Sequence, residues 1–243
     1  MRKSRLYRLF VMLEQMSKRL DCIASKVRNG RGVVDVGTDH AYLPLLLLKR
    51  GYKGNIIATD INDGPLQKAH QNIAEYGAEG AIELFLCNGL DSCRPELVDD
   101  IVIAGMGGDI ICGILDRAPW CERADMQLIL QPVTKPEILR YWLINNGFRI
   151  TGEELVFENG TIYQIITAVP GKAEKYTDAE LFTGSFDVIK GSPLLQKHIE
   201  THIVRFEKAS AGLSGASRSG LSAWRQMLLD ILSELYDIRR ACQ

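Results

Sequence analysis

Short apolar runs alternate with longer amphipathic segments through the first part of the chain. Strands are predicted for the β-branched or aliphatic runs at 33–37, 55–60, 82–87, 100–104 and 126–131. Helices are predicted for the segments between them, near 40–51, 63–77, 108–117 and 134–146. Because strand and helix take turns, right-handed crossovers join successive strands, and the pattern predicts an α/β fold with a parallel sheet.

The alternation stops after Gly147. Two β-rich runs, Glu153–Glu158 and Thr161–Val169, are joined by Asn159 and Gly160, and this dipeptide is the strongest short signal for a β-hairpin. The parallel sheet is therefore predicted to finish in an antiparallel pair of strands.

From about Tyr176 the pattern becomes helical. Apolar residues form a stripe at 195, 199, 203 and 206, and a heptad seam follows at 224, 228, 231, 235 and 238. The Ser- and Gly-rich stretch 212–220 between them predicts a loop. We expect a helical hairpin, and we divide the chain into a sheet domain, 1–171, and a helical coiled-coil region, 176–243.

The N-terminal segment combines helical periodicity with positive charge. Residues 1–31 carry nine Lys or Arg against Glu14 and Asp21, a net charge of +7, and the other 212 residues carry −8. A positive field gathered in one segment suits a phosphate backbone, and a solvated helix face explains the charge equally well. This basic helical lead-in at 1–31 is therefore a candidate contact for nucleic acid.

The amino-acid composition excludes several classes of protein. The 243 residues are 46% hydrophobic and 24% charged, which is ordinary for a globular protein. No apolar run approaches the roughly 20 residues of a membrane span, so we expect no membrane partner. The six cysteines include no Cys-x-x-Cys pair, which argues against a zinc ribbon or a disulfide framework and favours a cytoplasmic protein.

Two carboxylates follow neighbouring predicted strands. The first run breaks at Gly37, where the missing side chain lets a ligand approach the main chain and where a helix is expected to open. Asp60 ends the next strand, 25 residues after Asp35, near the spacing at which a strand-end acid meets ribose hydroxyls in doubly wound sheets. The sequence therefore predicts a site for a nucleotide-type ligand.

The residue type at position 39 helps to decide which nucleotide-type ligand the site can bind. A dinucleotide fingerprint needs glycine two and five residues after Gly37, where this chain has Asp39 and Tyr42. A carboxylate there repels a diphosphate, which argues against NAD or FAD and favours a ligand with a positive centre, such as S-adenosylmethionine. Asp39 either contacts the ligand or caps the helix, and His40 either lines the pocket or is an ordinary helix residue.

Two later strand ends complete the expected crevice. Asn88 and Gly89 follow the third strand, where the amide and the backbone could read an adenine edge. Gly105 and Met106 follow the fourth, where glycine leaves room for a ligand and an incoming base.

His198 and His202 stand four residues apart on a predicted helix, a spacing that can chelate a metal. No third ligand is evident, so we expect a solvated helix surface and no metal. Trp142 and Trp224 are expected to be core and seam residues.

Several motifs taken together resemble one family. They are Met-Ser-Lys-Arg-Leu at 16–20, Asp-Val-Gly-Thr-Asp-His-Ala-Tyr-Leu-Pro at 35–44, Ile-Ala-Gly-Met-Gly-Gly at 103–108 and Leu-Gln-Pro at 130–132. From about residue 16 to 240 the chain resembles the TrmK family of bacterial tRNA (adenine-22-N1)-methyltransferases. The resemblance implies a Rossmann-like class I methyltransferase fold, S-adenosyl-L-methionine as cofactor, and N1 of a tRNA adenine as methyl acceptor.

By position, the resemblance implies a cofactor pocket at Asp35, Gly37, Asp39, His40, Asp60, Asn88, Gly89, Gly105 and Met106, to which we add Ile61. Asp39 and His40 are the candidates for a catalytic role, chiefly in positioning. The family usually has Ser at Thr38, Glu at Asp60 and Asp at Asn88, and only the last difference exchanges a charge for an amide.

Adenine N1 carries an in-plane lone pair, so alignment matters more than a strong base, and residues 104–107 lack the Asn/Asp-Pro-Pro-aromatic segment used on exocyclic amines. We expect a monomer that binds tRNA through Arg5, Arg8, Lys18 and Arg19. The alternatives are a methyltransferase acting on another RNA base or on a protein, a noncatalytic RNA-binding protein that keeps the fold, and a NAD-dependent enzyme.

Overall fold

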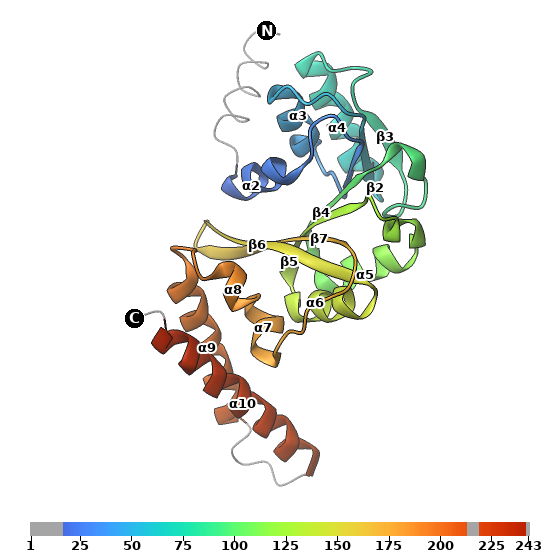
Figure 1. Cartoon of the computed structure of the whole chain (residues 1–243). Helices are drawn as coiled ribbons and strands as arrows, with labels where there is room; N and C mark the ends of the chain where they lie inside the picture. The colour runs from blue at the N-terminus through green and yellow to red at the C-terminus, as the bar shows by residue number, and fades with distance from the viewer. Residues whose placement is uncertain (1–16, 213–218, 242–243) are drawn as a thin grey trace.

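The computed structural model describes residues 17–212 and 219–241 of the chain (Figure 1). A seven-stranded sheet lies between two layers of helices, and a pair of long helices extends from one end of the molecule. The strands are β1 Val33–Val36, β2 Ile56–Asp60, β3 Glu83–Leu86, β4 Asp100–Gly107, β5 Gln127–Thr134, β6 Phe148–Glu158 and β7 Thr161–Pro170.

The helices of the sheet layers are α2 Lys18–Lys26, α3 Tyr42–Lys49, α4 Asp63–Tyr76, α5 Gly108–Asp116 and α6 Pro136–Asn145. The C-terminal helices are α7 Asp178–Thr183, α8 Phe186–Ile189, α9 Leu195–Gly212 and α10 Ser219–Ala241. The short 3-10 helices are η1 Pro95–Leu97 and η2 Pro119–Glu122.

The sheet has the order β3-β2-β1-β4-β5-β7-β6. Strands β1 to β5 run parallel, and β7 is antiparallel to both of its neighbours. This arrangement confirms the parallel sheet that ends in an antiparallel pair. The strand order reverses between β1 and β4, and such a switch point is where open α/β sheets bind ligands, outside the carboxyl ends of the strands.

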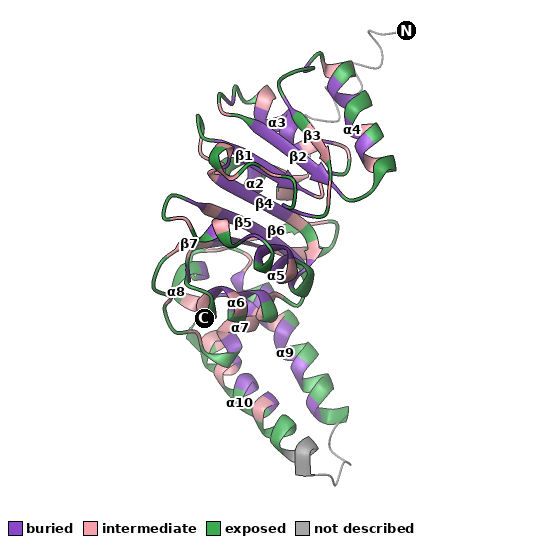
Figure 2. Cartoon of the chain, turned by 90° about the vertical axis from the view of Figure 1, so that its right-hand side faces the viewer, coloured by how far each residue is buried: buried purple, intermediate pink, exposed green. Residues whose placement is uncertain are grey.

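Both faces of the sheet are covered, so its central strands are apolar on both sides (Figure 2). Alternate residues enter two cores: Val33 and Ile56 pack with α2, α3 and α4, while Val34 and Ile57 pack with α5 and α6. The buried aliphatic strands thereby hold their carboxyl ends in a fixed row, where the candidate site lies.

The antiparallel hairpin is longer than its sequence pattern. Strand β6 begins at Phe148 rather than at Glu153, because residues on both sides of a bulge between Ile150 and Gly152 still pair with β7. At the turn, Asn159 and Gly160 have φ of 49° and 82°, as a two-residue hairpin turn requires.

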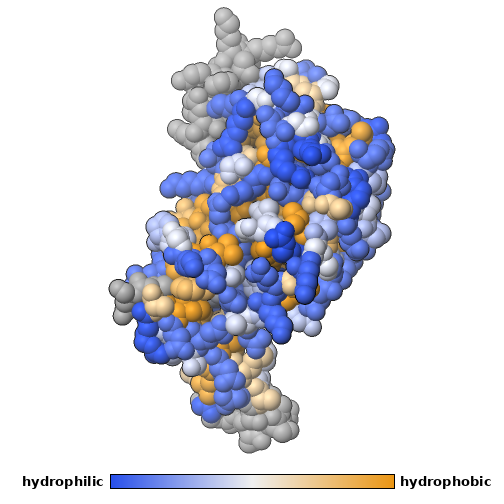
Figure 3. All heavy atoms as spheres, viewed as in Figure 1, coloured by the Kyte–Doolittle hydropathy of each residue, from blue (hydrophilic) through white to orange (hydrophobic). Residues whose placement is uncertain are grey.

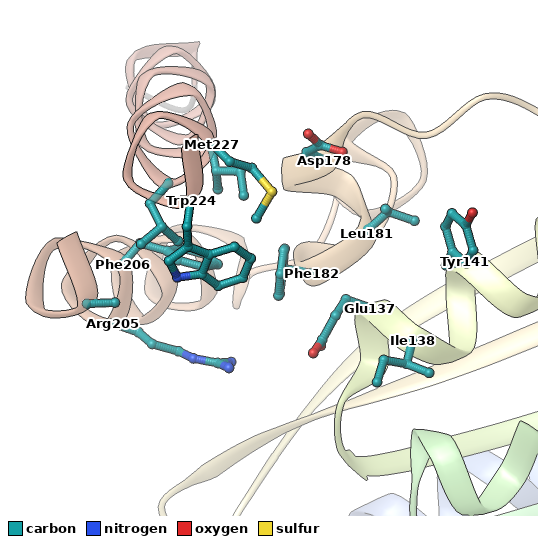
Figure 4. A pocket seen from close by; sticks show the side chains of 13 residues that line it. Glu137, Ile138, Tyr141, Asp178, Leu181, Phe182, Arg205, Phe206, Trp224 and Met227 are labelled. Carbon is teal, nitrogen blue, oxygen red and sulfur yellow. The ribbon is translucent and has the colours of Figure 1, made fainter. Parts of the chain in front are cut away.

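The C-terminal helices α9 and α10 lie side by side (Figures 1 and 2). Leu228, Ile231 and Leu235 of the predicted seam are buried in one cluster with residues of α9. The seam prediction was wrong at Trp224, which is 50% exposed because it borders a hollow of about 580 Å³ between α6, α7, α9 and α10 (Figure 4). Trp142, in contrast, packs against the core and stacks on Phe148.

The expectation of a solvated surface at His198 and His202 was also wrong. The two residues are 3% and 7% exposed, because this face of α9 packs toward α7 and the sheet rather than toward solvent. Ring nitrogen Nε2 of His198 lies 2.9 Å from the carbonyl oxygen of Thr183.

Hydrophilic side chains cover most of the face shown in Figure 3, and apolar residues are grouped in several small areas. Within residues 17–212 and 219–241, no helix is long and apolar enough to cross a membrane.

Candidate active site

The first corner of the site is the turn after β1. Gly37 has a φ of 71°, and the backbone N–H groups of Gly37 and Thr38 both donate to the carbonyl oxygen of Thr59, at 2.8 and 2.9 Å. Helix α3 begins only at Tyr42. The predicted helix is therefore present but opens five residues after Gly37, and the N–H groups of Gly37 and Thr38 are taken up by the neighbouring strand. Recognition at this corner falls to side chains.

Gly37 also brings the first and fourth strands together. A Cβ built on Gly37 would lie 2.3 Å from Cε of Met106, so this methionine occupies the space that any larger residue would need. Met106 is half-buried, and its neighbour Gly105 is exposed with a φ of 79°. The predicted pairing of these two strand ends in one crevice is thus present.

Between Gly37 and α3 the chain adopts an unusual conformation. Asp39 and Ala41 have φ of 54° and 59°, in the left-handed region that side chains disfavour. Ala41, not Asp39, precedes the first residue of α3, so the capping interpretation of Asp39 was wrong. The Asp39 side chain is 65% exposed at the rim, and local strain of this kind is concentrated at functional sites.

His40 lies beside Asp39 and is held from several directions. Its Nε2 is 3.3 Å from a carboxylate oxygen of Asp39, and its Nδ1 is 2.9 Å from the hydroxyl of Tyr42. The side chain of Asn72 donates to the backbone oxygen of His40 at 2.9 Å. Because both ring nitrogens have neighbours, the imidazole is better placed to orient the loop than to move a proton.

The two strand-end acids are both buried, each 7% exposed. Asp35 accepts a 2.6 Å hydrogen bond from the hydroxyl of Thr38, and burial raises its pKa to about 6. Asp60 accepts from the backbone N–H of Asp39 at 3.2 Å and of Asn62 at 2.8 Å. Both carboxylates therefore accept hydrogen bonds from the loop between β1 and α3, and Asp60 also holds the start of the loop after β2.

The charged side chains at this corner of the site are mainly acidic. Across the described part of the chain, Asp35, Asp39 and Asp60 form no ion pair with a Lys or Arg. Three carboxylates, two at strand ends and one on the loop between β1 and α3, give a negative field that favours a cationic ligand. Ile61, next to Asp60, is 61% exposed and offers an apolar surface at the same rim.

The third strand end is tied to the first two. The hydroxyl of Thr59 donates to the carbonyl oxygen of Gly89 at 2.8 Å. Gly89 has a φ of 64°, and a Cβ there would lie 2.8 Å from Ile114. The side-chain oxygen of Asn88 accepts from Arg117 at 3.0 Å, which leaves its NH₂ group without a partner in the described structure. That group can donate to a ligand.

A further cluster, which sequence reasoning missed, lies over the exposed Gly105. Arg19, near the start of α2, donates to the side chain of Gln131, lies 3.9 Å from Glu158 and places its guanidinium 5.2 Å from the centroid of Tyr163. Gln131 is fully buried within β5. The only available signal was the Leu-Gln-Pro run at 130–132, which does not reveal the partner on α2.

Arg19 was predicted to contact tRNA phosphates, and in the structure it has partners within the protein. Its guanidinium is engaged inside the protein, because α2 crosses the sheet beside β6 and β7. Lys18 is exposed on the same helix, whereas Arg5 and Arg8 lie outside the described residues. Residues 17–212 and 219–241 contain no group of three or more His, Cys, Asp or Glu that could hold a metal.

Comparison with known proteins places this geometry in a family. A family model described as a methyltransferase domain matches residues 16–166. The tRNA (adenine(22)-N(1))-methyltransferase of Bacillus subtilis (strain 168) is 32% identical over 164 residues, 68% of this chain and 69% of that protein.

Solved structures agree over a longer stretch. The crystal structure of the B. subtilis M1A22 tRNA methyltransferase TrmK has a TM-score of 0.82 at 26% identity, covering 93% of this chain and 99% of that one. Streptococcus pneumoniae Sp1610 in complex with S-adenosyl-L-methionine has a TM-score of 0.80 at 32% identity, covering 93% and 100%. The chain therefore belongs to the TrmK family of bacterial tRNA (adenine-22-N1)-methyltransferases, which the motifs of its sequence already resembled.

Proposed function

We propose that this chain transfers a methyl group from S-adenosyl-L-methionine to N1 of an adenine, position 22, in tRNA. The observation that carries the proposal is a set of three carboxylates at the switch point of a methyltransferase sheet, none of which forms an ion pair with a Lys or Arg of the described residues. Asp35, Asp39 and Asp60 together repel a diphosphate and attract a sulfonium nucleoside with an amino acid end. Family membership supports the same donor and acceptor.

The residues present fit this cofactor. Asp60 has carboxylate oxygens for the ribose hydroxyls, and the exposed Ile61 offers an apolar surface for the adenine ring. Asn88 and Gly89 would hold the adenine edge, and Gly37 and Met106, which lie against each other, would border the centre of the cofactor. When bound, S-adenosylmethionine supplies an electrophilic methyl group on its sulfonium.

The transfer needs little acid–base help from the protein. The lone pair of adenine N1 forms a bond to the methyl carbon as the carbon–sulfur bond breaks, and the positive charge passes from sulfur to the base. No proton leaves, so a strong general base is unnecessary. Asp39 and His40 act by shaping the pocket, and the exposed main chain at Gly105 leaves room for the incoming base.

The experiment that tests this function uses the purified protein, methyl-labelled donor and total tRNA, followed by mapping of the labelled nucleotide. We expect N1-methyladenine at position 22. Label on another RNA base or on protein would favour a different methyltransferase. Tight donor binding without transfer to any tRNA would favour a noncatalytic RNA-binding protein. Calorimetry with NAD tests the remaining alternative.

We also propose that the basic N-terminal segment holds the tRNA backbone. Lys18 is exposed near the carboxyl edge of the sheet, while Lys53 is an exposed lysine in the loop before β2, at the opposite edge. Lys18→Glu is expected to weaken tRNA binding and to lower the slope of log affinity against log salt by about 1. Lys53→Glu serves as the matched control, and equal slopes for both variants would remove α2 from the interface.

We further propose that the protein works as a monomer in the cytoplasm and that residues 1–171 and 176–243 are separate domains. The five cysteines within the described ranges are free thiols, which suits a reducing compartment. Strand β7 ends at Pro170 and α7 begins at Asp178, so the boundary falls between two elements. Sedimentation of the protein with and without tRNA tests the monomer.

A further inference from the structure

A second cleft lies on the other side of β5 from the cofactor corner. It has a volume of about 550 Å³ and is lined by residues 132–136 after β5, residues 160–164 at the hairpin turn, and one side of α9. Its lining combines aromatic, amide, hydroxyl and basic side chains. This mixed character differs from the largely apolar hollow shown in Figure 4, and it resembles the surroundings that a nucleotide needs.

The cleft adjoins the position where methyl transfer is proposed. Pro132 and Thr134, which line the cleft, are the register partners of Met106 and Gly107 in the neighbouring strand β4. A base held over Gly105 therefore has the cleft directly beside it. A strand of RNA that enters over Gly105 therefore needs to pass only Arg19 of α2, which contacts Tyr163 in the lining of the cleft.

The wall of the cleft contains a buried polar atom without a partner. Nδ1 of His202 is buried and makes no hydrogen bond, and the residue as a whole is 7% exposed. Burial lowers the pKa of His202 to about 3, with His198 and Arg205 contributing, so its ring is neutral at physiological pH. A neutral imidazole can donate or accept one hydrogen bond, which suits a base edge and not a phosphate.

Positive charge stands at the rim. Lys197 and Arg205 lie two turns apart on α9, both are exposed, and neither forms an ion pair with a carboxylate in the described structure. The Nζ of Lys197 lies 3.8 Å from the centroid of Phe157 on β6. In Figure 4 the Arg205 side chain extends from α9 on the side of the hollow where Glu137 and Ile138 lie. These two cations are free to meet phosphates.

We propose that this cleft holds a nucleotide that neighbours the target adenine in the tRNA strand. Its base lies against His202, and the adjoining phosphates meet Lys197 and Arg205. The proposal rests on the function proposed above. It assigns α9 a part in presenting the adenine, because a strand anchored on both sides of the crevice keeps the extracted base in line with the methyl group.

The test couples a change in the protein to a change in the RNA. Wild type and His202→Phe, which keeps a ring against Phe206 and loses both nitrogens, are assayed on tRNA carrying an abasic nucleotide immediately 5′ or 3′ of adenine 22. For wild type, one of the two abasic substrates should lower kcat/KM by about tenfold. For His202→Phe, the same substrate should lower kcat/KM by less than about twofold, since the contact is already lost. Independent, multiplicative losses would overturn the proposal.

A surface variant gives a second, fold-neutral measurement. Arg205→Glu should raise KM for tRNA by about tenfold and leave the affinity for S-adenosylmethionine unchanged. Lys208→Glu makes the same charge change on α9 at an exposed lysine that lines no part of the cleft, and it should alter KM by less than about twofold. Equal effects of the two variants would mean that α9 acts only through its overall charge, and the cleft would be wrong.

The outcomes distinguish the two proposals. Wild-type protein that methylates no tRNA would overturn the proposed function and the cleft with it. Wild-type protein that methylates adenine 22, with unchanged kinetics for both His202→Phe and Arg205→Glu, would overturn the cleft alone.

Discussion

The carboxyl edge of the sheet and the C-terminal helical pair both bury titratable groups, but they keep them in opposite charge states. At the edge, Asp35 has a pKa raised to about 6 by burial, so it is an anion at neutral pH. In the helices, burial lowers the pKa of His198 to about 4 and of His202 to about 3, so both are neutral.

The difference follows from what each region does. The edge keeps unpaired charge at a cost in stability, and we infer that a cationic ligand compensates for it. The helices exclude charge so that their apolar cluster can close. Unbalanced charge is thus found at the turn after β1 and the neighbouring strand ends, while the C-terminal helices keep their buried titratable groups neutral.

Arg140 on α6 joins the β6–β7 hairpin to α7, between the two regions, and its removal is expected to have the largest effect. It donates to Glu153 at 2.5 Å, to Gln164 at 2.6 Å and to the backbone oxygen of Leu181 at 2.9 Å, and it is fully buried. Arg140→Met should lower the free energy of unfolding by about 3–5 kcal/mol in urea titrations, because Glu153 becomes a buried, unpaired charge.

The double variant Arg140→Met with Glu153→Gln separates charge from packing. It should recover a large part of the loss, since no unpaired charge remains in the interior. If the double variant is as unstable as the single one, the connection between the hairpin and α7 depends on shape and hydrogen bonds instead.

Asp60→Ala tests the edge directly. Loss of the ribose acceptors should weaken S-adenosylmethionine binding by about 100-fold in calorimetry. Asp60→Glu, which keeps the carboxylate, is the control and should retain most of the affinity. Because Asp60 also braces Asp39 and Asn62, the melting temperature must be measured alongside. Unchanged binding by Asp60→Ala would remove this acid from the cofactor pocket.

The variant Gly108→Ala tests whether close backbone packing holds the carboxyl edge of the sheet in place. A Cβ on Gly108 would lie 2.2 Å from the backbone oxygen of Lys135, so the start of α5 and the start of α6 would have to separate. We expect a loss of about 1–3 kcal/mol in urea titrations. Gly113→Ala, on the same helix with nothing within 4 Å, should instead stabilise the protein by up to about 1 kcal/mol. Similar results for both would show that helix propensity alone decides.

The smallest expected effect concerns how the free energy of unfolding depends on pH, and Asp35 and His202 are expected to change it in opposite directions. The folded pKa of Asp35 lies above its unfolded value of 3.8, so its contribution to stability is lost as pH rises from about 4 through 6. The folded pKa of His202 lies below its unfolded value of 6.5, so its contribution is lost as pH falls from 6.5 toward 3.

Urea titrations at pH 4.5 and 7.5 measure both. Relative to wild type, Asp35→Asn should gain about 1–2 kcal/mol more at pH 7.5 than at pH 4.5, and His202→Phe should show the reverse. The same sign for both variants would contradict the contrast between the regions.

Much of the fold could be predicted because its signals are local. The parallel strands, the crossover helices and the Asn159-Gly160 turn are each written in a few neighbouring residues. The expected row of strand ends at Gly37, Asp60, Asn88 and Gly105 follows, because parallel strands end at the same edge. The comparisons confirm the family that the motifs resembled.

What failed depended on partners far along the chain. Arg19 was predicted to contact tRNA phosphates, and its engagement by Gln131, 112 residues away, was not foreseen. His198 and His202 were expected to be solvated, and they are buried because other elements cover their side of α9. The apolar stripe of α9 indicates its buried face, but no local pattern reports how far beyond the stripe other elements extend that cover.

The sequence by itself determined the order of elements, the switch point and the residue types at the strand ends, since hydrophobic periodicity and turn chemistry act over a few residues. Tertiary structure alone decided the left-handed conformations of Asp39 and Ala41, the buried Arg140–Glu153 pair and the neutral imidazole beside the second cleft. These features arise only when distant segments exclude water from one another, because burial sets both the charge state of a group and the partners it must find.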